Sequence, residues 1–154
     1  MIHGFLGAGK TRFAKLLEQK YSALRFSPDE WMAQFYGTDP PEALYATYHE
    51  LISQMIERYW TRSAELGLDV ILDGGFWSRL ERNHVRQKAL FLGANVKLYK
   101  LEVSDSVAWQ RISKRNEAMD GSVFISKATF ESLKGRFEEL QEDEEFTSIS
   151  QDEL

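Results

Sequence analysis

The stretch GFLGAGKT, residues 4–11, constrains what this chain can fold into more than any other part of the sequence. It fits the pattern GxxxxGK[S/T], in which a glycine-rich loop connects a buried strand to a helix and wraps around the phosphates of a nucleotide. Glycine matters here because a Cβ atom would obstruct the backbone amides that face the phosphates. Only Met1, Ile2 and His3 precede the loop, so the strand before it is expected to be unusually short.

This phosphate loop predicts which residues bind a nucleotide. The helix that begins near Lys10 would direct the positive end of its dipole at the phosphates. Lys10 would bridge the β and γ phosphates, and the Thr11 hydroxyl would hold Mg²⁺, so the predicted cofactors are ATP and Mg²⁺. The predicted nucleotide-binding residues are Gly4, Phe5, Leu6, Gly7, Ala8, Gly9, Lys10, Thr11 and Arg12.

The size and composition of the chain limit the other possibilities. At 154 residues it is expected to form a single domain, residues 1–154. No apolar run approaches the roughly 18 residues of a membrane span, so no membrane partner is expected. The chain has no cysteine, which excludes disulfides, thiol nucleophiles and thiolate metal sites. Together with the lack of an N-terminal signal sequence, this favours a cytoplasmic location.

Charge is distributed unevenly along the chain. Residues 137–154 hold eight acids and no base, so the sequence is expected to end in an acidic tail at 138–154. The remaining 16 acids and all 19 Lys and Arg residues lie in residues 1–136, which makes that part slightly basic. It can attract a nucleotide, but it is not basic enough to indicate general nucleic-acid binding.

Short strand-like runs alternate with longer helical patterns. Strands are predicted at 23–26, 70–72, 96–103 and 146–149, in addition to the short one before the loop. Helices are predicted after the loop, from Ser27 to near Gly37, from Glu42 to near Gly67, over 79–92, after Ser104 and after Ser126. The last of these is expected to carry Phe130, Leu133, Phe137 and Leu140 on one face. Ser27 and Glu30 form a capping box pattern at the start of one of these helices. This order predicts an α/β fold in three layers, α/β/α, with a mostly parallel central sheet of about five strands.

Four stretches in order resemble the small P-loop kinases of the AAA_33 and zeta-toxin-like group, to which phage polynucleotide kinases and chloramphenicol phosphotransferase are related. They are GFLGAGKT, RFSPDEWM, VILDGGFWSR and WQRISKRN. The resemblance runs from Ile2 to about Glu145. It implies a P-loop NTPase fold and transfer of the ATP γ-phosphoryl group to a hydroxyl on a small molecule or a nucleic-acid end.

Two aspartates follow predicted strands at the edge of the sheet where α/β proteins bind ligands. In the resembling kinases the residue that matches Asp29 is the general base, although Asp29 could simply stabilise the start of a helix through its dipole. Asp73 is expected to orient the Mg²⁺ hydration shell or the acceptor, the alternative being a turn residue at the strand end. Trp31 is a candidate for the acceptor pocket, and core packing explains it equally well.

Arginines supply the remaining candidates. DGGFWSR is similar to the DGFPR of nucleoside monophosphate kinases with one residue inserted, which makes Arg79 a substrate-binding candidate. The alternative places Arg79 on one solvated helix face with Arg82 and Arg86. Arg111 and Arg115 share a helical face and match the RxxxR lid element of the resembling kinases, whose guanidiniums neutralise the transferring phosphate. A small lid is therefore expected around 111–126.

Three functions remain open at this point. The leading one is an ATP-dependent kinase whose partners are ATP and a small hydroxyl-bearing substrate, with Lys10, Asp29, Arg111 and Arg115 as catalytic residues. A polynucleotide 5′-kinase would need a basic channel for the strand, and the modest positive charge counts against it. A regulatory ATPase that binds ATP without an acceptor would have no need of Asp29. The acceptor and the oligomeric state are not set by the sequence.

Overall fold

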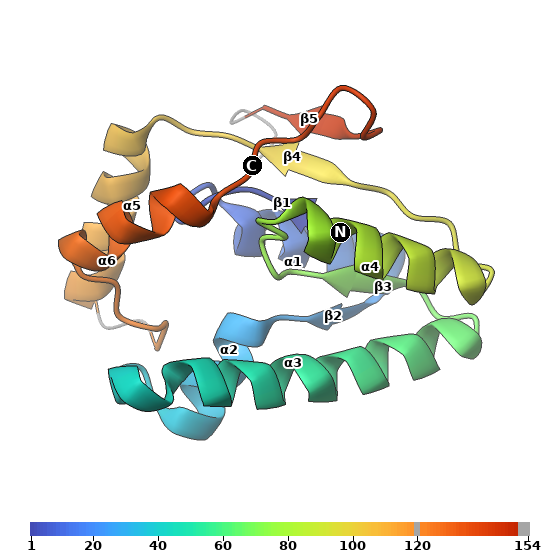
Figure 1. Cartoon of the computed structure of the whole chain (residues 1–154), viewed down its shortest axis with the longest axis horizontal. Helices are drawn as coiled ribbons and strands as arrows, with labels where there is room; N and C mark the ends of the chain where they lie inside the picture. Colours follow the sequence, from blue (N-terminus) through green and yellow to red (C-terminus); the bar gives the residue numbers. More distant parts are fainter. Residues whose placement is uncertain (119–120, 151–154) are drawn as a thin grey trace.

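The structure is a computed structural model that describes residues 1–118 and 121–150 (Figure 1). Its strands are β1 (Ile2–His3), β2 (Leu24–Phe26), β3 (Val70–Leu72), β4 (Tyr99–Leu101) and β5 (Thr147–Ile149). Its helices are α1 (Lys10–Tyr21), α2 (Pro28–Tyr36), α3 (Glu42–Glu65), α4 (Arg79–Phe91), α5 (Asp105–Ala118) and α6 (Lys127–Leu133), followed by the 3-10 turn η1 (Lys134–Arg136). Within the described part of the chain, no helix is long and apolar enough to cross a membrane.

The strands are parallel and fall into two sheets. One has the order β1-β4-β5 and the other pairs β2 with β3. A single parallel bridge between His3 and Gly75 joins them, and the Gly4 amide donates to the Gly75 carbonyl at 3.3 Å. The five predicted strands are therefore present, but the central sheet is not continuous. The two-residue β1 is too short to pair with β3 along its length, as the three residues before the phosphate loop indicated.

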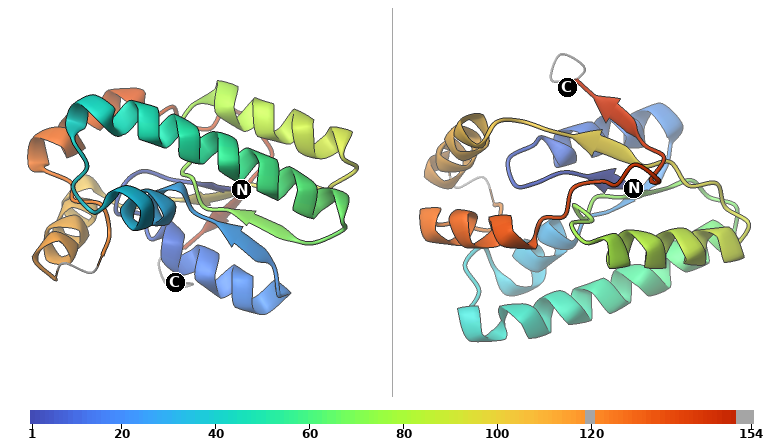
Figure 2. Two further views of the ribbon diagram at one scale, coloured as in Figure 1. Left: turned by 90° about the horizontal axis from the view of Figure 1, so that it is seen from below. Right: turned by 45° about the horizontal axis from the view of Figure 1, so that its top comes forward.

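Helices cover both faces of the sheet and make three layers (Figure 2, left). α3 and α4 lie on one face, and α1 lies on the other. Successive side chains of a strand point to opposite faces, so Ile71 packs with α1 residues such as Leu17 and Leu72 packs with α3 residues such as Ile56. The predicted three-layer α/β fold with a mostly parallel sheet is confirmed.

Serine residues cap the helices that the sequence predicted after Ser27, Ser104 and Ser126. Their hydroxyls accept hydrogen bonds from amides in the first turns of α2, α5 and α6. Ser78, which was not predicted as a cap, does the same at α4. The capping box at α2 is only half formed, because the Glu30 carboxylate binds the Arg25 guanidinium at 2.6 Å. A bond to the arginine guanidinium adds the attraction of a full positive charge, which the backbone amide of a capping box lacks.

Two predicted elements are shorter than expected. The strand predicted over 96–103 is limited to β4, where β1 and β5 pair with it on its two sides. The helix after Ser126 ends at Leu133, so Phe137 lies beyond it. Phe137 instead stacks on His3, with ring centroids 4.7 Å apart, and thereby covers the end of β1.

A buried arginine anchors the acidic C-terminal segment, of which residues 138–150 are described. Arg82 on α4 is completely buried, and its guanidinium forms two bonds of 2.7 and 2.8 Å to the Glu144 carboxylate. The same group donates to the carbonyls of Phe76, Trp77 and Glu138. The interpretation of Arg82 as part of a solvated helix face is therefore wrong. The part of the predicted tail at 151–154 lies outside the described residues.

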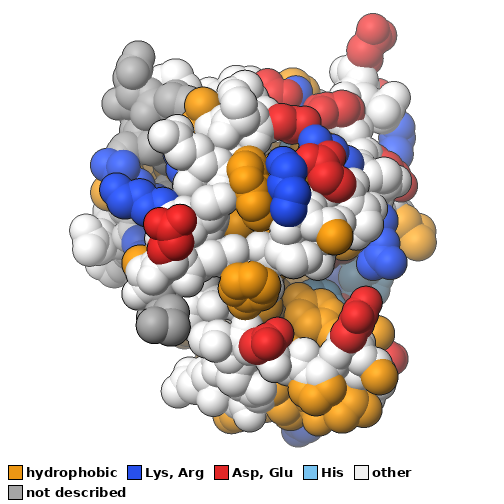
Figure 3. Space-filling model, turned by 90° about the vertical axis from the view of Figure 1, so that its left-hand side faces the viewer, with side chains coloured by type: hydrophobic (Ala, Val, Ile, Leu, Met, Phe, Trp, Pro, Cys, Tyr) orange, Lys and Arg blue, Asp and Glu red, His pale blue; other side chains and the backbone are white. Residues whose placement is uncertain are grey.

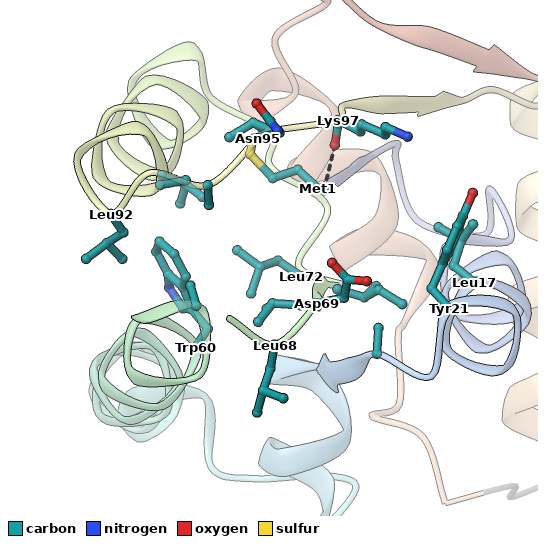
Figure 4. A pocket seen from close by; sticks show the side chains of 18 of the residues that line it. Met1, Leu17, Tyr21, Trp60, Leu68, Asp69, Leu72, Leu92, Asn95 and Lys97 are labelled. Carbon is teal, nitrogen blue, oxygen red and sulfur yellow. Dashed lines mark hydrogen bonds between the residues drawn. The ribbon is translucent and has the colours of Figure 1, made fainter. Parts of the chain in front are cut away.

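A cavity of about 510 Å³ lies at the amino ends of the strands (Figure 4). Its lining is mainly apolar and includes Trp60 from α3 and Leu72 from β3. The amino group of Met1 donates to the Lys97 carbonyl at 2.9 Å beside it, and burial lowers the pKa of this amine to about 5. The phosphate loop follows the carboxyl end of β1, so this cavity is at the opposite end of the sheet from the candidate site.

Candidate active site

The phosphate loop joins β1 to α1 in a conformation that depends on glycine. Gly7 and Gly9 have φ angles of +75° and +96°, which side-chain-bearing residues rarely adopt. A Cβ atom on Gly7 would also lie 2.6 Å from the Ala108 carbonyl oxygen of α5. The loop therefore packs directly against α5. The first amides of α1 have no partner one turn earlier and are available to an anion, as at other helix N-termini.

Lys10 lies across the mouth of this loop. Its ammonium donates to the Phe5 carbonyl at 2.8 Å, so the side chain folds back over the turn that precedes it. Burial lowers the pKa of Lys10, and nearby Arg115 lowers it further. Asp29 and Asp73 act in the opposite direction and stabilise the ammonium. Four residues from four different elements are thus close enough to influence one another beside the phosphate loop.

Asp73 is a buried carboxylate at the carboxyl end of β3. It is 4% exposed, and burial raises its pKa to about 6 despite the favourable effects of Lys10, the Thr11 hydroxyl and Arg25. One oxygen, Oδ2, accepts a bond of 3.3 Å from Arg25. The other, Oδ1, is buried and has no hydrogen-bond partner among the described residues. An unsatisfied carboxylate oxygen is costly, so this position is suited to a ligand that supplies positive charge or a donor.

The oxygen donors near Asp73 fit Mg²⁺. A hydroxyl from Thr11 and a carboxylate from Asp73 are hard oxygen ligands, and Mg²⁺ bound with phosphates usually takes only one or two protein ligands and several waters. Among residues 1–118 and 121–150 there is no group of three or more His, Asp or Glu side chains that could hold a metal ion by itself. These residues are therefore suited to a metal ion that binds together with a nucleotide, and less suited to a metal ion that the protein would hold by itself.

Asp29 lies in the first turn of α2, where its side chain is exposed. Ser27 provides the cap of this helix, so the Asp29 carboxylate is not needed for that bond. It acts electrostatically on Lys10 and Asp73 and on Tyr45 of α3. Burial raises the pKa of Tyr45 to about 12, with a further contribution from Asp29. Asp29 is thus placed between the phosphate loop and the aromatic surface of α3.

The two predicted lid arginines border the phosphate loop. The Arg111 guanidinium donates to the Gly7 carbonyl at 3.3 Å. Arg115 donates to the Val123 carbonyl at 3.4 Å, and its buried Nε has no hydrogen-bond partner among the described residues. Both residues are on α5, which packs against the loop at Ala108. Arg111 and Arg115, which are four residues apart, therefore both lie beside the loop where the phosphates of a nucleotide are expected to bind.

The segment after α5 reaches back toward α2 and α3. The Asn116 amide forms bonds of 2.7 and 3.3 Å to the backbone of Ile125, which holds residues 121–126 against α5. The Phe124 amide donates to the Thr38 carbonyl in the connection between α2 and α3 at 2.8 Å. Residues 119–120 of the predicted lid lie outside the described part of the chain.

Other predicted site residues have different surroundings. Trp31 is half-buried and contacts the rings of Phe26, Phe35 and Tyr59 in edge-to-face arrangements, which supports the core-packing alternative. Arg12 is exposed on α1.

Arg79, the substrate-binding candidate, is engaged by the C-terminal segment. Its guanidinium donates to Asp143 at 2.5 Å, and its amide donates to the Glu138 carboxylate at 2.7 Å. The structure therefore does not bring Arg79 together with Lys10, Asp29 and Asp73. DGGFWSR is longer than DGFPR, which shifts this arginine along the chain. The shift is consistent with its position away from the phosphate loop.

Sequence reasoning missed Arg25. It lies in β2, and its guanidinium binds Glu18, Glu30 and Asp73, so it connects α1, α2 and the end of β3. A charged residue between Leu24 and Phe26 in a short parallel strand is unusual and was the available signal. Its partners could not be read from the sequence, because Asp73 is 48 residues away.

The comparison with known families decides the relationship. The model of the AAA_33 family, described as an AAA domain, matches residues 1–140. The chain belongs to the AAA_33 family. This confirms the resemblance to P-loop kinases of the AAA_33 group that the four sequence stretches indicated. No curated protein sequence matches the chain.

Solved structures show the same fold for this AAA_33 chain. A kinase candidate from Chloroflexus aurantiacus j-10-fl is similar with a TM-score of 0.76, at 16% identity over 96% of this chain and 84% of that one. A gluconokinase from Sinorhizobium meliloti 1021 has a TM-score of 0.59, at 15% identity over 96% and 79%. Chaetomium thermophilum Kti12, in complex with ADP-AlF3, has a TM-score of 0.62, at 15% identity over 98% and 88%.

Proposed function

We propose that this AAA_33 protein is an ATP-dependent kinase that transfers the γ-phosphoryl group to a hydroxyl of a small molecule. The observation that carries the proposal is the convergence of Lys10, Asp29, Asp73 and Arg115 beside the phosphate loop. Phosphoryl transfer needs charge neutralisation, alignment and a group that takes the acceptor's proton, and these four side chains can provide each of them. Related folds are described as a gluconokinase and as a complex with ADP-AlF3.

Each residue has a distinct role in this proposal. The loop amides and Lys10 bind the β and γ phosphates, while Arg111 and Arg115 stabilise the charge that develops on the transferring group. Asp29 accepts the proton of the acceptor hydroxyl. Thr11 and Asp73 would hold Mg²⁺, which when bound neutralises phosphate charge. Arg25 keeps Asp73 in place, and Asn116 holds the 121–126 segment of the proposed lid.

Asp29→Asn tests the general base. Asparagine keeps the shape of the side chain but cannot accept the proton, so we expect the rate of acceptor phosphorylation to fall about 10²- to 10⁴-fold with little change in ATP affinity. The measurement is acceptor-dependent ADP release with a library of hydroxyl compounds. Asp69→Asn is the matched control, because Asp69 lies at the other end of β3, beside the cavity in Figure 4. Unchanged turnover in Asp29→Asn would remove Asp29 from the mechanism.

The same experiment separates the alternatives. A regulatory ATPase would bind and hydrolyse ATP at the same rate with and without every acceptor, and its ATP hydrolysis would not depend on Asp29. A polynucleotide 5′-kinase would phosphorylate an oligonucleotide with a free 5′-hydroxyl. Including such an oligonucleotide among the acceptors therefore tests all three functions in one assay.

Asp73→Asn is expected to lower the kinase activity and to raise the free energy of unfolding. The pKa of Asp73 is raised in the folded protein to about 6, so its ionisation opposes folding as pH rises from about 4 to above 6. Removing the charge should therefore raise the free energy of unfolding at pH 7 by about 1–3 kcal/mol. Mg²⁺-dependent activity should fall sharply. Urea unfolding at pH 5 and pH 7.5, with Asp69→Asn as the control, measures the effect, and a destabilised Asp73→Asn at both pH values would contradict it.

A further inference from the structure

The surface that faces the phosphate loop from α2 and the first half of α3 carries no basic residue. Residues 26–57 contain neither lysine nor arginine. The acids in this range are Asp29, Glu30, Asp39, Glu42, Glu50 and Glu57. Glu30 is neutralised by Arg25, and Glu57 forms an ion pair with Lys88. The other acids form no ion pair with any residue that the structure describes. The α2 and α3 side of the site is therefore negative.

The distribution of charge is visible on the face of the molecule in Figure 3. Its upper part shows both basic and acidic side chains, whereas the lower part, formed by α2 and α3, shows chiefly hydrophobic and acidic side chains and almost no basic ones. The site therefore has one half that supplies positive charge, which suits the phosphates of ATP, and one half that supplies almost none.

Aromatic rings accompany the acids on α2 and α3. The rings of Tyr36 and Tyr48 are parallel, with centroids 3.8 Å apart. Tyr45 stacks on His49 with centroids 6.1 Å apart, and it is the residue on which Asp29 acts. All four are half-buried, so each keeps part of its surface accessible. Aromatic faces bind planar rings by stacking and attract cations, but they offer nothing to an anion.

The basic groups nearest to this surface are already committed. The Arg25 guanidinium is 9% exposed and binds three carboxylates, from Glu18, Glu30 and Asp73. Lys10 and Arg115 lie on the side of the phosphate loop. An acceptor with a carboxylate or phosphate would therefore meet Asp29 with no counter-ion from residues 26–57, and Coulomb repulsion would weaken its binding.

We propose that the acceptor is an alcohol that carries no negative charge and contains an aromatic or other planar ring. The inference rests on the proposed kinase function and narrows it. The acceptor oxygen forms a bond to the γ-phosphorus as the bond to the β–γ bridging oxygen breaks, ADP leaves with that electron pair, and the hydroxyl proton passes to Asp29. The planar ring lies against the tyrosine rings of α2 and α3. Sugar acids, phosphorylated alcohols and polynucleotide ends are poor acceptors.

A matched set of probes tests the charge and the ring separately. The probes are the neutral 1-phenyl-2-propanol, the cationic 1-amino-3-phenyl-2-propanol, the anionic 3-phenyllactate and the non-aromatic 1-cyclohexyl-2-propanol, which share one secondary hydroxyl, assayed within a wider library of neutral, cationic and anionic alcohols. We expect the best acceptors by kcat/KM to be non-anionic and to contain a planar ring, and 3-phenyllactate to be at least about fivefold worse than its neutral match. A best acceptor that is anionic, or that has no planar ring, overturns the inference while the kinase function stands. If no alcohol is phosphorylated although ATP binds, the proposed function itself fails, and the inference fails with it.

Variants on α3 then locate the effect. Tyr45→Leu should raise the KM of the best acceptor several-fold without changing that of ATP, and Tyr45→Phe should restore it, because stacking needs the ring and not the hydroxyl. Glu42→Lys, three residues from Tyr45 on the same helix face, should improve kcat/KM for 3-phenyllactate and reduce it for the amine. Glu65→Lys introduces the same charge at the far end of α3 and is the control. Equal effects of Glu42→Lys and Glu65→Lys would overturn the role assigned to this surface.

Discussion

Replacing Arg82 by alanine is expected to lower the free energy of unfolding by about 3–5 kcal/mol, because it leaves the buried Glu144 carboxylate without its partner. Glu144 is 3% exposed, and Arg82 holds the pKa of its carboxyl down to about 2. The variant would also remove the donor shared by the carbonyls of Phe76, Trp77 and Glu138. The whole stability of a domain is about 5–15 kcal/mol, so at the lower end of this range the loss would unfold much of the population.

Urea unfolding followed by circular dichroism measures this loss. Arg79→Ala is the matched control, since Arg79 belongs to the same helix and binds the neighbouring Asp143, but this pair is exposed and should contribute little to stability. Arg82→Met combined with Glu144→Leu should recover part of the loss, because no unpaired charge remains buried. A loss below about 1 kcal/mol in Arg82→Ala would show that the bond does not anchor the C-terminal segment.

The same ion pair predicts a dependence on pH. The pKa of Glu144 is depressed in the folded protein, so its contribution is complete above its unfolded value near 4.5 and is lost as pH falls toward 2. Arg82→Ala should therefore flatten the acid limb of the stability curve. Wild-type protein and Arg82→Ala that lose stability in parallel between pH 4.5 and pH 2 would contradict this assignment.

The second large effect is expected at the phosphate loop. Lys10→Ala should reduce phosphoryl transfer about a thousandfold or more, because it removes the positive charge nearest to the transferring group. The fold should remain intact, since among residues 1–118 and 121–150 the Lys10 ammonium donates only to the Phe5 carbonyl, and burial already lowers the pKa of this lysine.

The measurement compares ATP consumption with the pooled acceptor library and thermal unfolding of the same samples. Lys20→Ala, in the last turn of α1 and exposed, is the control and should match the wild type in both. Normal turnover by a folded Lys10→Ala variant would end the kinase mechanism as proposed here.

Only part of the candidate site could be predicted from the sequence. The phosphate loop, Asp29 and Asp73 were predictable because their positions are local to strand ends, where parallel strands bring their carboxyl ends to one edge. Arg79 was a candidate from motif similarity alone, and the structure places its guanidinium against Asp143. Helical periodicity shows which face of a helix an arginine lies on. It does not show whether that face meets the substrate or another segment of the chain.

By itself, the sequence determined the phosphate loop, the alternation of strands and helices, the serine caps and the absence of bases in residues 26–57. These features depend on neighbouring residues: glycine dihedrals, capping bonds and hydrophobic periodicity. Only the tertiary structure decided which charges are partners, as for Arg82 with Glu144, 62 residues apart, and Arg25 with Asp73, 48 apart. Such pairs have no local signal, because a carboxylate in an acidic tail has the same sequence pattern whether it is solvated or buried against an arginine.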